Sequence, residues 1–202
     1  PKSRPDNPGT PRLKRPTHLP GSRMSDLWRL RTLGYLGLWL LIAATLILAR
    51  LLPLPVPADA WPRPDLLLPL TLAWVLRRPS HLPALAIGLM FLAEDLFVMR
   101  PPGLWALIVL AGTEFLRRRQ SAVREMHIAL EWGMVSAVML VMYLANRIGL
   151  AIVMTPREPL DLSLTRLIFT ILIYPLVVLV LQSVIRVRKP ATGEVDELGR
   201  KL

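Results

Sequence analysis

Two adjacent acidic residues, Glu94 and Asp95, lie inside a long apolar run and are the first candidates for chemistry in this sequence. A charged side chain at the centre of a membrane-spanning helix costs on the order of 2.5–3.5 kcal/mol on insertion scales, so such residues are usually paired or functional. Consecutive side chains on a helix point about 100° apart. Glu94 and Asp95 are therefore predicted to contact different neighbours.

Asp95 shares a helix face with small side chains, because it follows Gly88 by seven residues and Ala84 by eleven. Small residues let a second helix approach closely. Arg147 and Arg166 occupy a similar depth in later apolar runs, so we predict an ion pair between Asp95 and one of these arginines. The alternative is that these charges lie near lipid headgroups and are merely solvated.

Two further features predict helix packing. Pro175 lies inside the last apolar run, where a proline frees the carbonyl group four residues earlier and kinks the helix. In a membrane, a neighbouring group must satisfy that carbonyl. Gly133 and Ala137 form a small-xxx-small pair, a pattern that favours close contact between helices.

Two other acidic residues have basic partners at helical spacing. Glu114 precedes Arg117 and Arg118 by three and four residues, and Glu131 follows His127 by four. Side chains at these spacings are neighbours on the helix surface. We therefore predict that both acids form local pairs.

The residue types exclude several kinds of chemistry. The sequence has no cysteine, which excludes disulfides, cysteine-ligated zinc, iron–sulfur clusters and thiol nucleophiles. Its three histidines show no metal-ligand spacing such as H-E-x-x-H. Paired carboxylates, a Ser–His–Asp set on facing segments and a phosphate-binding loop are also missing. We therefore expect a protein without enzymatic activity, metal or cofactor.

The composition indicates an all-α integral membrane protein. Of 202 residues, 53% are hydrophobic and 19% charged, and the mean hydropathy is +0.45; soluble domains have about 25% charged residues. The charges fall between long apolar runs, which is typical of a polytopic membrane protein. Six runs are predicted to form a bundle of six transmembrane helices, although the second and fourth are short: 35–52, 66–76, 82–99, 104–116, 128–154 and 162–185.

The basic residues predict the orientation of this bundle. Nineteen Lys and Arg residues, including Arg77, fall in the gaps on one side, and six, including Arg50, fall on the other. Because basic loops stay in the cytoplasm, both termini are expected to be cytoplasmic. The same bias accounts for most of the net charge of +11, so the charge does not support a nucleic-acid partner.

The chain divides into three predicted regions. Residues 1–23 are rich in proline and basic residues, and we expect a disordered extension there, upstream of a translation start at Met24. Residues 24–189 form the six-helix membrane domain, and residues 190–202 form a short cytoplasmic tail.

The order and spacing of several loose motifs resemble the rod shape-determining protein MreD family. The resemblance covers residues 24–189. A Pro-Pro turn after Asp95 departs from the glycine- and serine-containing loop expected in the family. The residues that carry the resemblance are 63–67 (RPDLL), Gly88, 94–96 (EDL), 100–104 (RPPGL), 174–176 (YPL) and 186–189 (RVRK).

This resemblance implies a non-enzymatic, multi-pass protein of the bacterial inner membrane that belongs to the cell-elongation machinery. Its implied partners are the bitopic protein MreC, the glycosyltransferase RodA, a class B penicillin-binding protein and, indirectly, the MreB filament. Anionic lipid is a further possible partner, since each basic residue near the membrane surface adds roughly 1 kcal/mol. The family also resembles the six-helix substrate-binding subunits of energy-coupling-factor transporters. The alternative function is therefore a small-molecule-binding membrane subunit of a transporter.

Overall fold

The computed structural model describes residues 21–52, 64–124, 127–155 and 159–183, and every regular element within these ranges is helical. The first helix begins at Gly21, so the last three residues of the extension predicted over 1–23 are helical. The rest of that extension and the tail predicted over 190–202 lie outside the described residues.

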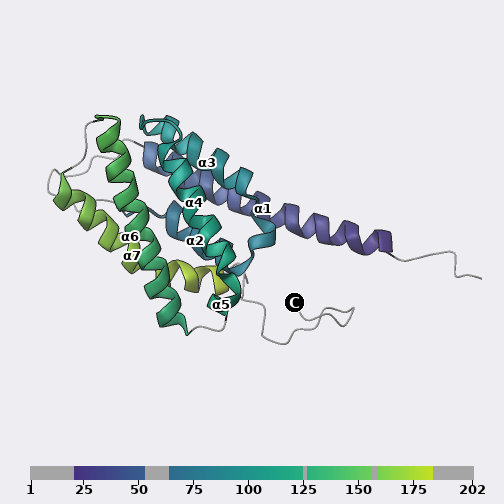
Figure 1. Cartoon of the computed structure of the whole chain (residues 1–202). Helices are drawn as coiled ribbons and strands as arrows, with labels where there is room; N and C mark the ends of the chain where they lie inside the picture. Colours follow the sequence, from purple (N-terminus) through teal and green to yellow (C-terminus); the bar gives the residue numbers. More distant parts are fainter. Residues whose placement is uncertain (1–20, 53–63, 125–126, 156–158, 184–202) are drawn as a thin grey trace, which may run out of the picture.

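Each of the six apolar runs forms a helix (Figure 1). Pro79–His81 (η1) adds a short 3-10 turn after the second helix, and α5 (Gln120–Arg124) adds a single extra turn after α4. The six helices are α1 (Gly21–Leu51), α2 (Leu67–Arg77), α3 (Ala84–Phe97), α4 (Leu104–Arg118), α6 (Ile128–Ile152) and α7 (Leu160–Ser183).

Three of these helices are long and apolar enough to cross a membrane by length and composition. They are the part of α1 over Thr32–Leu51, together with α6 and α7. The helices α3 and α4 have 14 and 15 residues and α2 has 11, whereas a comfortable span needs about 20. The chain therefore has the character of a membrane protein, with three crossings supported by length.

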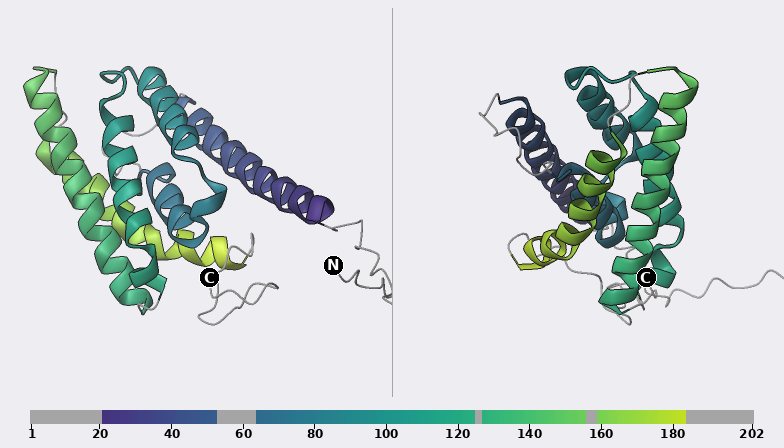
Figure 2. Two further views of the ribbon diagram at one scale, coloured as in Figure 1. Left: turned by 45° about the vertical axis from the view of Figure 1, so that its right-hand side comes forward. Right: turned by 90° about the vertical axis from the view of Figure 1, so that its left-hand side faces the viewer.

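The short helix α2 occupies the centre of the bundle (Figure 2). All of its residues are buried, and it packs mainly against α7 and α4. Its sequence, LLPLTLAWVLR, is apolar on every side except at Thr71 and the terminal Arg77, which is the pattern expected of a helix buried all round.

The outer faces of the surrounding helices carry large apolar side chains. Such a surface is unusually extensive for a soluble monomer, and it fits a helix bundle surrounded by lipid or by other transmembrane helices. Exposed examples are Leu41 and Leu48 on α1, Leu85 and Leu89 on α3, Val141 and Ile148 on α6, and Leu172 and Leu176 on α7.

Glycines mark the closest approaches of α4 to its neighbours. Gly88 on α3 faces Leu110, whose Cδ1 would lie 3.4 Å from an added Cβ, in agreement with the predicted small-residue face of α3. An added Cβ at Gly149 would lie 2.7 Å from Leu104 Cδ1, and one at Gly112 would lie 2.6 Å from Met142 Sδ. Backbone packing between α4 and α6 therefore depends on Gly112 and Gly149.

The predicted packing role of Gly133 and Ala137 is not realised within the described part of the chain. Both residues are exposed on α6, and an added Cβ at Gly133 would meet no atom within 4 Å. The reason is rotational: α6 turns the face with Val135, Met139 and Met142 toward the core, and the small pair lies on another face.

Candidate functional site

Asp95 is buried and caps the helix that follows its own. Its Oδ2 accepts hydrogen bonds from the N–H groups of Gly103, at 3.1 Å, and Ala106, at 3.2 Å. The two helices are joined by a tight turn in which Gly103 has a φ of +88°, so the carboxylate reaches the electropositive N-terminal end of α4. Such ends favour a negative side chain.

The predicted ion pair between Asp95 and Arg147 or Arg166 is therefore wrong for the described residues. Asp95 faces α4 along the same side as Gly88, whereas Arg147 and Arg166 lie on α6 and α7. Two backbone N–H groups bind Oδ2 of the carboxylate in place of an arginine. Ala84 begins α3 at its other end and is half-buried.

Glu94, by contrast, pairs with an arginine. Its buried Oε1 contacts Nη1 of Arg50 at the end of α1, and Arg50 Nη1 also lies 3.9 Å from Oδ2 of Asp65. Glu94 and Asp95 thus contact different neighbours, as their 100° offset predicts. Sequence reasoning missed Arg50 because we assigned it to the outer loop residues, although a basic residue ending an apolar run is the natural partner of a buried acid.

Asp65 begins the buried helix α2. Its Oδ1 accepts hydrogen bonds from the N–H groups of Leu67, at 3.1 Å, and Leu68, at 3.3 Å. Its own N–H donates to Oγ1 of Thr170 at 3.1 Å, which ties the start of α2 to the middle of α7. Asp65, a residue of the RPDLL motif, is therefore the N-terminal cap that allows a short helix to start inside the bundle.

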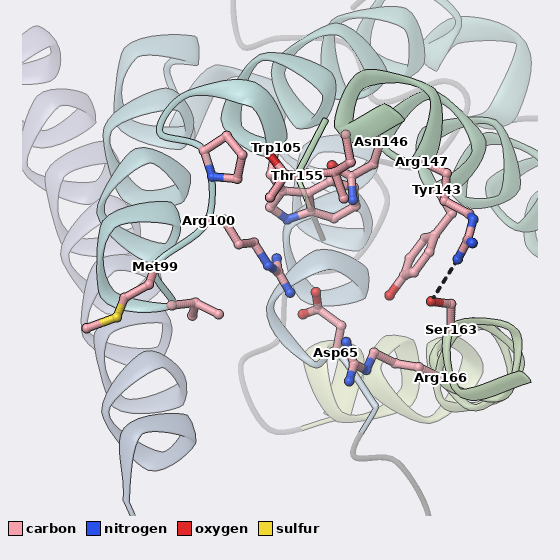
Figure 3. A pocket seen from close by; sticks show the side chains of 13 residues that line it. Asp65, Met99, Arg100, Trp105, Tyr143, Asn146, Arg147, Thr155, Ser163 and Arg166 are labelled. Atoms are coloured by element: carbon pink, nitrogen blue, oxygen red, sulfur yellow. Dashed lines mark hydrogen bonds between the residues drawn. The ribbon is translucent and has the colours of Figure 1, made fainter. Parts of the chain in front are cut away.

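A polar cavity of about 240 Å³ lies beside this cap, between the turn after α3, α6 and α7 (Figure 3). Among the residues that the structure describes, three arginines line it: Arg100, Arg147 and Arg166. Arg147 Nη1 donates to Ser163 Oγ at 3.3 Å. Arg147 and Arg166 thus line the same cavity, and the carboxylate in its lining is that of Asp65, not that of Asp95.

A second cavity, of about 260 Å³, lies on the other side of Asp65 and is lined by Arg50, Glu94 and mainly apolar residues of α1 and α2. Both cavities include Asp65. Because α2 starts at Leu67, residues of the longer neighbouring helices extend past its N-terminus. Both cavities thus lie beside the N-terminal end of α2.

A fully buried ion pair joins three helices at the C-terminal end of α2. Arg77 Nη1 lies 2.9 Å from Oε1 of Glu131, and the hydroxyl group of Tyr174 donates to the same oxygen at 2.9 Å. Arg77 also donates to the carbonyl oxygen of Ala73 at 3.2 Å. The predicted local pair of Glu131 with His127 is therefore wrong, because α6 turns Glu131 inward while His127 is exposed.

Pro175 lies inside α7, which continues from Leu160 to Ser183. Its missing N–H frees the carbonyl group of Ile171, and the indole N–H of Trp132 on α6 donates to that oxygen at 3.0 Å. This bond provides the compensation that the sequence predicts for a proline inside a membrane helix.

Glu114, near the C-terminal end of α4, and His81, just after α2, have simpler surroundings. Glu114 lies 3.7 Å from both Arg117 and Arg118, which confirms the predicted local pairs. His81 is buried with its ring 5.1 Å from that of Tyr35. Burial and, to a smaller extent, the positive charge of Arg78 lower the pKa of His81 from its usual value.

The described residues contain no group of three or more His, Cys, Asp or Glu side chains that could hold a metal ion. Their buried carboxylates act as helix caps and as partners of arginine. Comparison with known proteins adds no homologue: no family model matches the chain, and neither a curated protein nor a solved structure matches it.

Proposed function

We propose that this protein is a non-enzymatic scaffold of the bacterial inner membrane, an MreD-like component of the cell-elongation complex. It binds an MreC-like bitopic protein. Either directly or by way of that protein, it also associates with RodA, a class B penicillin-binding protein and the MreB filament. In this proposal α1, α2, α3, α4, α6 and α7 form the six-helix membrane domain, both termini are cytoplasmic, and the architecture resembles that of energy-coupling-factor substrate-binding subunits.

One observation supports the scaffold role above the others: buried polar groups hold the helices together, while the outward faces are apolar. Asp95 joins α3 to α4, Glu94 joins α3 to Arg50 of α1, and Glu131 joins α6 to α2 and α7. A bundle fixed internally in this way presents stable apolar surfaces on which transmembrane partners can pack.

The exposed basic residues at the C-terminal end of α4 suit a second kind of partner. Arg118 is 79% exposed and lies with Arg117 and Arg119 at the end of α4. Basic residues at a cytoplasmic membrane surface attract anionic lipid. Lipid would thus help to hold the bundle in its proposed orientation.

Affinity purification of the tagged chain from membranes in mild detergent, followed by mass spectrometry, tests the scaffold role. We expect MreC and the wall-synthesis enzymes to accompany the chain. Asp95→Asn, which alters the cap of α4, is expected to weaken this assembly, whereas Glu114→Gln, which alters an exposed pair, is the matched control. Recovery of none of these partners by the wild-type chain would contradict the proposal.

The polar cavity supports a second candidate function, a small-molecule-binding subunit of a transporter. Arg147 and Arg166 line one partly open cavity at an end of the bundle, as a ligand site would require. In the same purification, a pair of transporter ATPases in place of MreC would favour this function over the scaffold.

A further inference from the structure

We propose that the cavity lined by Asp65, Trp105 and Tyr143 binds a neutral group that carries hydroxyls, such as a sugar ring or a glycerol unit. This inference goes beyond the scaffold role, which needs no ligand. For the transporter alternative it rests on that function and names the chemistry of its ligand. The hydroxyl groups belong either to a free sugar or polyol or to the headgroup of a lipid.

The indole N–H of Trp105 is a donor that needs an acceptor. Trp105 is 3% exposed and lines the cavity, and among the described residues its Nε1 has no hydrogen-bond partner. A buried donor without a partner costs free energy, so the cavity favours an occupant that brings an acceptor. The indole nitrogens of Trp39 and Trp74 are also buried and unpaired, but neither residue lines this cavity or the second one.

Asp65 provides an acceptor in the same lining. Its Oδ1 accepts the N–H groups of Leu67 and Leu68. Its Oδ2 lies 3.9 Å from Nη1 of Arg50, which is beyond hydrogen-bond distance, so Oδ2 can accept a further hydrogen bond. An indole N–H only donates and a carboxylate only accepts, whereas a hydroxyl group does both. A ligand hydroxyl is therefore the simplest group that can bond to both Trp105 and Asp65.

Further groups of the lining suit a ligand with several hydroxyls. Figure 3 shows Trp105 on one side of the space beside Asp65, with the hydroxyl end of Tyr143 directed into that space. The Tyr143 hydroxyl and the Asn146 amide can each donate and accept hydrogen bonds. The rings of Trp105 and Tyr143 meet edge to face, with their centroids 5.7 Å apart. They form an apolar wall on which the carbon skeleton of a sugar can pack.

The size of the cavity limits the ligand to a small group. Its volume of about 240 Å³ lies below the range of about 300–1,000 Å³ that is usual for drug-sized ligands. One sugar ring or a glycerol unit, alone or as the end of a lipid, fits this space better than a whole vitamin-sized molecule. In the orientation proposed above, this end of the bundle faces away from the cytoplasm, so the ligand comes from the outer side of the membrane.

The test uses the full chain purified in lauryl dimethylamine oxide, because a sugar-based detergent would compete for the site. Saturation-transfer NMR measures the binding of glycerol and methyl glucoside as free probes. Tetrahydropyran, which has the ring of a sugar without its hydroxyl groups, is the control ligand. The lipid probe is monoglucosyldiacylglycerol in phosphatidylcholine nanodiscs, with the lipid retained by the chain measured by mass spectrometry. We expect saturable binding of a free probe or of the glycolipid.

The variant Trp105→Phe removes the indole donor and keeps an aromatic ring, and it is expected to weaken binding about tenfold or more. Tyr143→Phe removes one hydroxyl and leaves the ring packing in place. It is expected to weaken binding as well, which keeps the test decisive if Trp105→Phe does not fold. Trp132→Phe removes an indole donor outside the cavity. It is the matched control and is expected to bind like the wild type.

The outcomes separate the two sources of the ligand. Binding of a free probe that depends on Trp105 and Tyr143 identifies a free sugar or polyol. Retention of the glycolipid alone, with the same dependence, identifies a lipid headgroup. The inference is overturned if neither probe binds, if tetrahydropyran binds as well as methyl glucoside, or if Trp105→Phe and Trp132→Phe lose binding equally.

The same measurements separate this inference from the proposed function. A chain that recovers MreC without binding either kind of probe rejects the hydroxyl-binding site and leaves the scaffold role standing. A chain that recovers transporter ATPases without binding either kind of probe rejects the site and leaves the transporter function standing.

Discussion

Arg77 Nη1 and Glu131 Oε1 lie 2.9 Å apart with neither side chain exposed, although 54 residues separate them in the chain. The hydroxyl of Tyr174 donates to the same carboxylate oxygen. One contact therefore links the end of α2 to the beginning of α6 and the second half of α7, and the surrounding protein leaves neither charge exposed to solvent.

Replacing one member of this pair is expected to be costly. Glu131→Gln keeps the shape of the side chain but leaves the Arg77 charge without compensation. Loss of one partner of a buried ion pair typically destabilises a protein by about 3–5 kcal/mol. The measurement is the free energy of unfolding by denaturant in detergent micelles, compared with the wild type.

Two further variants test whether the loss of stability in Glu131→Gln is electrostatic in origin. Glu114→Gln removes a charge from the half-exposed pair with Arg117 and Arg118, where exposed ion pairs contribute about 0–1 kcal/mol. The double variant Arg77→Met with Glu131→Leu removes both buried charges and is expected to recover most of the stability. A double variant as unstable as Glu131→Gln would contradict the electrostatic explanation.

The bond from Trp132 to the Ile171 carbonyl is expected to matter only while Pro175 is present. Trp132→Phe removes the indole donor and is expected to lower the free energy of unfolding by about 0.5–1.5 kcal/mol. In a Pro175→Ala background, the N–H restored at position 175 pairs with the same carbonyl, so the effect of Trp132→Phe becomes smaller. A double-mutant cycle measures this coupling, and strictly additive effects would show that the two positions are independent.

Two glycines of α6 are expected to respond oppositely to the same change. Gly149→Leu forces a side chain against Leu104, and overpacking of this kind usually costs about 1–3 kcal/mol. Gly133→Leu enters open space and gains up to about 1 kcal/mol of helix propensity. Thermal unfolding of both variants in one detergent makes the comparison, and similar losses of stability in both would argue against the described contact between α4 and α6.

His81 is expected to make the stability of the fold depend on pH. Its folded-state pKa is lowered by burial and by Arg78, so the unfolded chain binds a proton more readily than the folded chain. The stability associated with neutral His81 is present above the unfolded-state pKa of about 6.5 and declines as the pH falls toward the folded-state value. Melting temperatures between pH 7.5 and 5.0 should fall less steeply for His81→Gln than for the wild type.

The existence of the six helices was predictable because apolar runs separated by proline-rich gaps favour helices, although α1 begins at Gly21, well before the predicted run 35–52. The face of α3 with Gly88 and Asp95 was also predictable, since helical periodicity places both residues toward one neighbour. The partner of Asp95 was not, because a tight turn brought backbone donors closer than any arginine. Hydropathy cannot foresee such a turn.

Arg77 illustrates a second limit of the sequence. It was counted among cytoplasmic loop residues because Arg78 and a proline follow it, yet its side chain is fully buried. The signal that was available is the isolated acid Glu131 in an apolar run, which needs a distant cation. To identify that cation, one must know which face of α2 is turned toward α6. This rotation depends on packing between segments that are far apart in the chain.

The enclosed position of α2 has a consequence for the order in which the chain folds during synthesis. Eleven residues ending in Arg77 are too few to be retained in a bilayer by hydrophobicity alone. Their final contacts include Thr170 and, through Glu131, Tyr174, which the ribosome produces roughly a hundred residues later. Stable packing of α2 must therefore wait for α7, because a nascent chain arrested before residue 160 lacks the contacts with Thr170 and, through Glu131, with Tyr174.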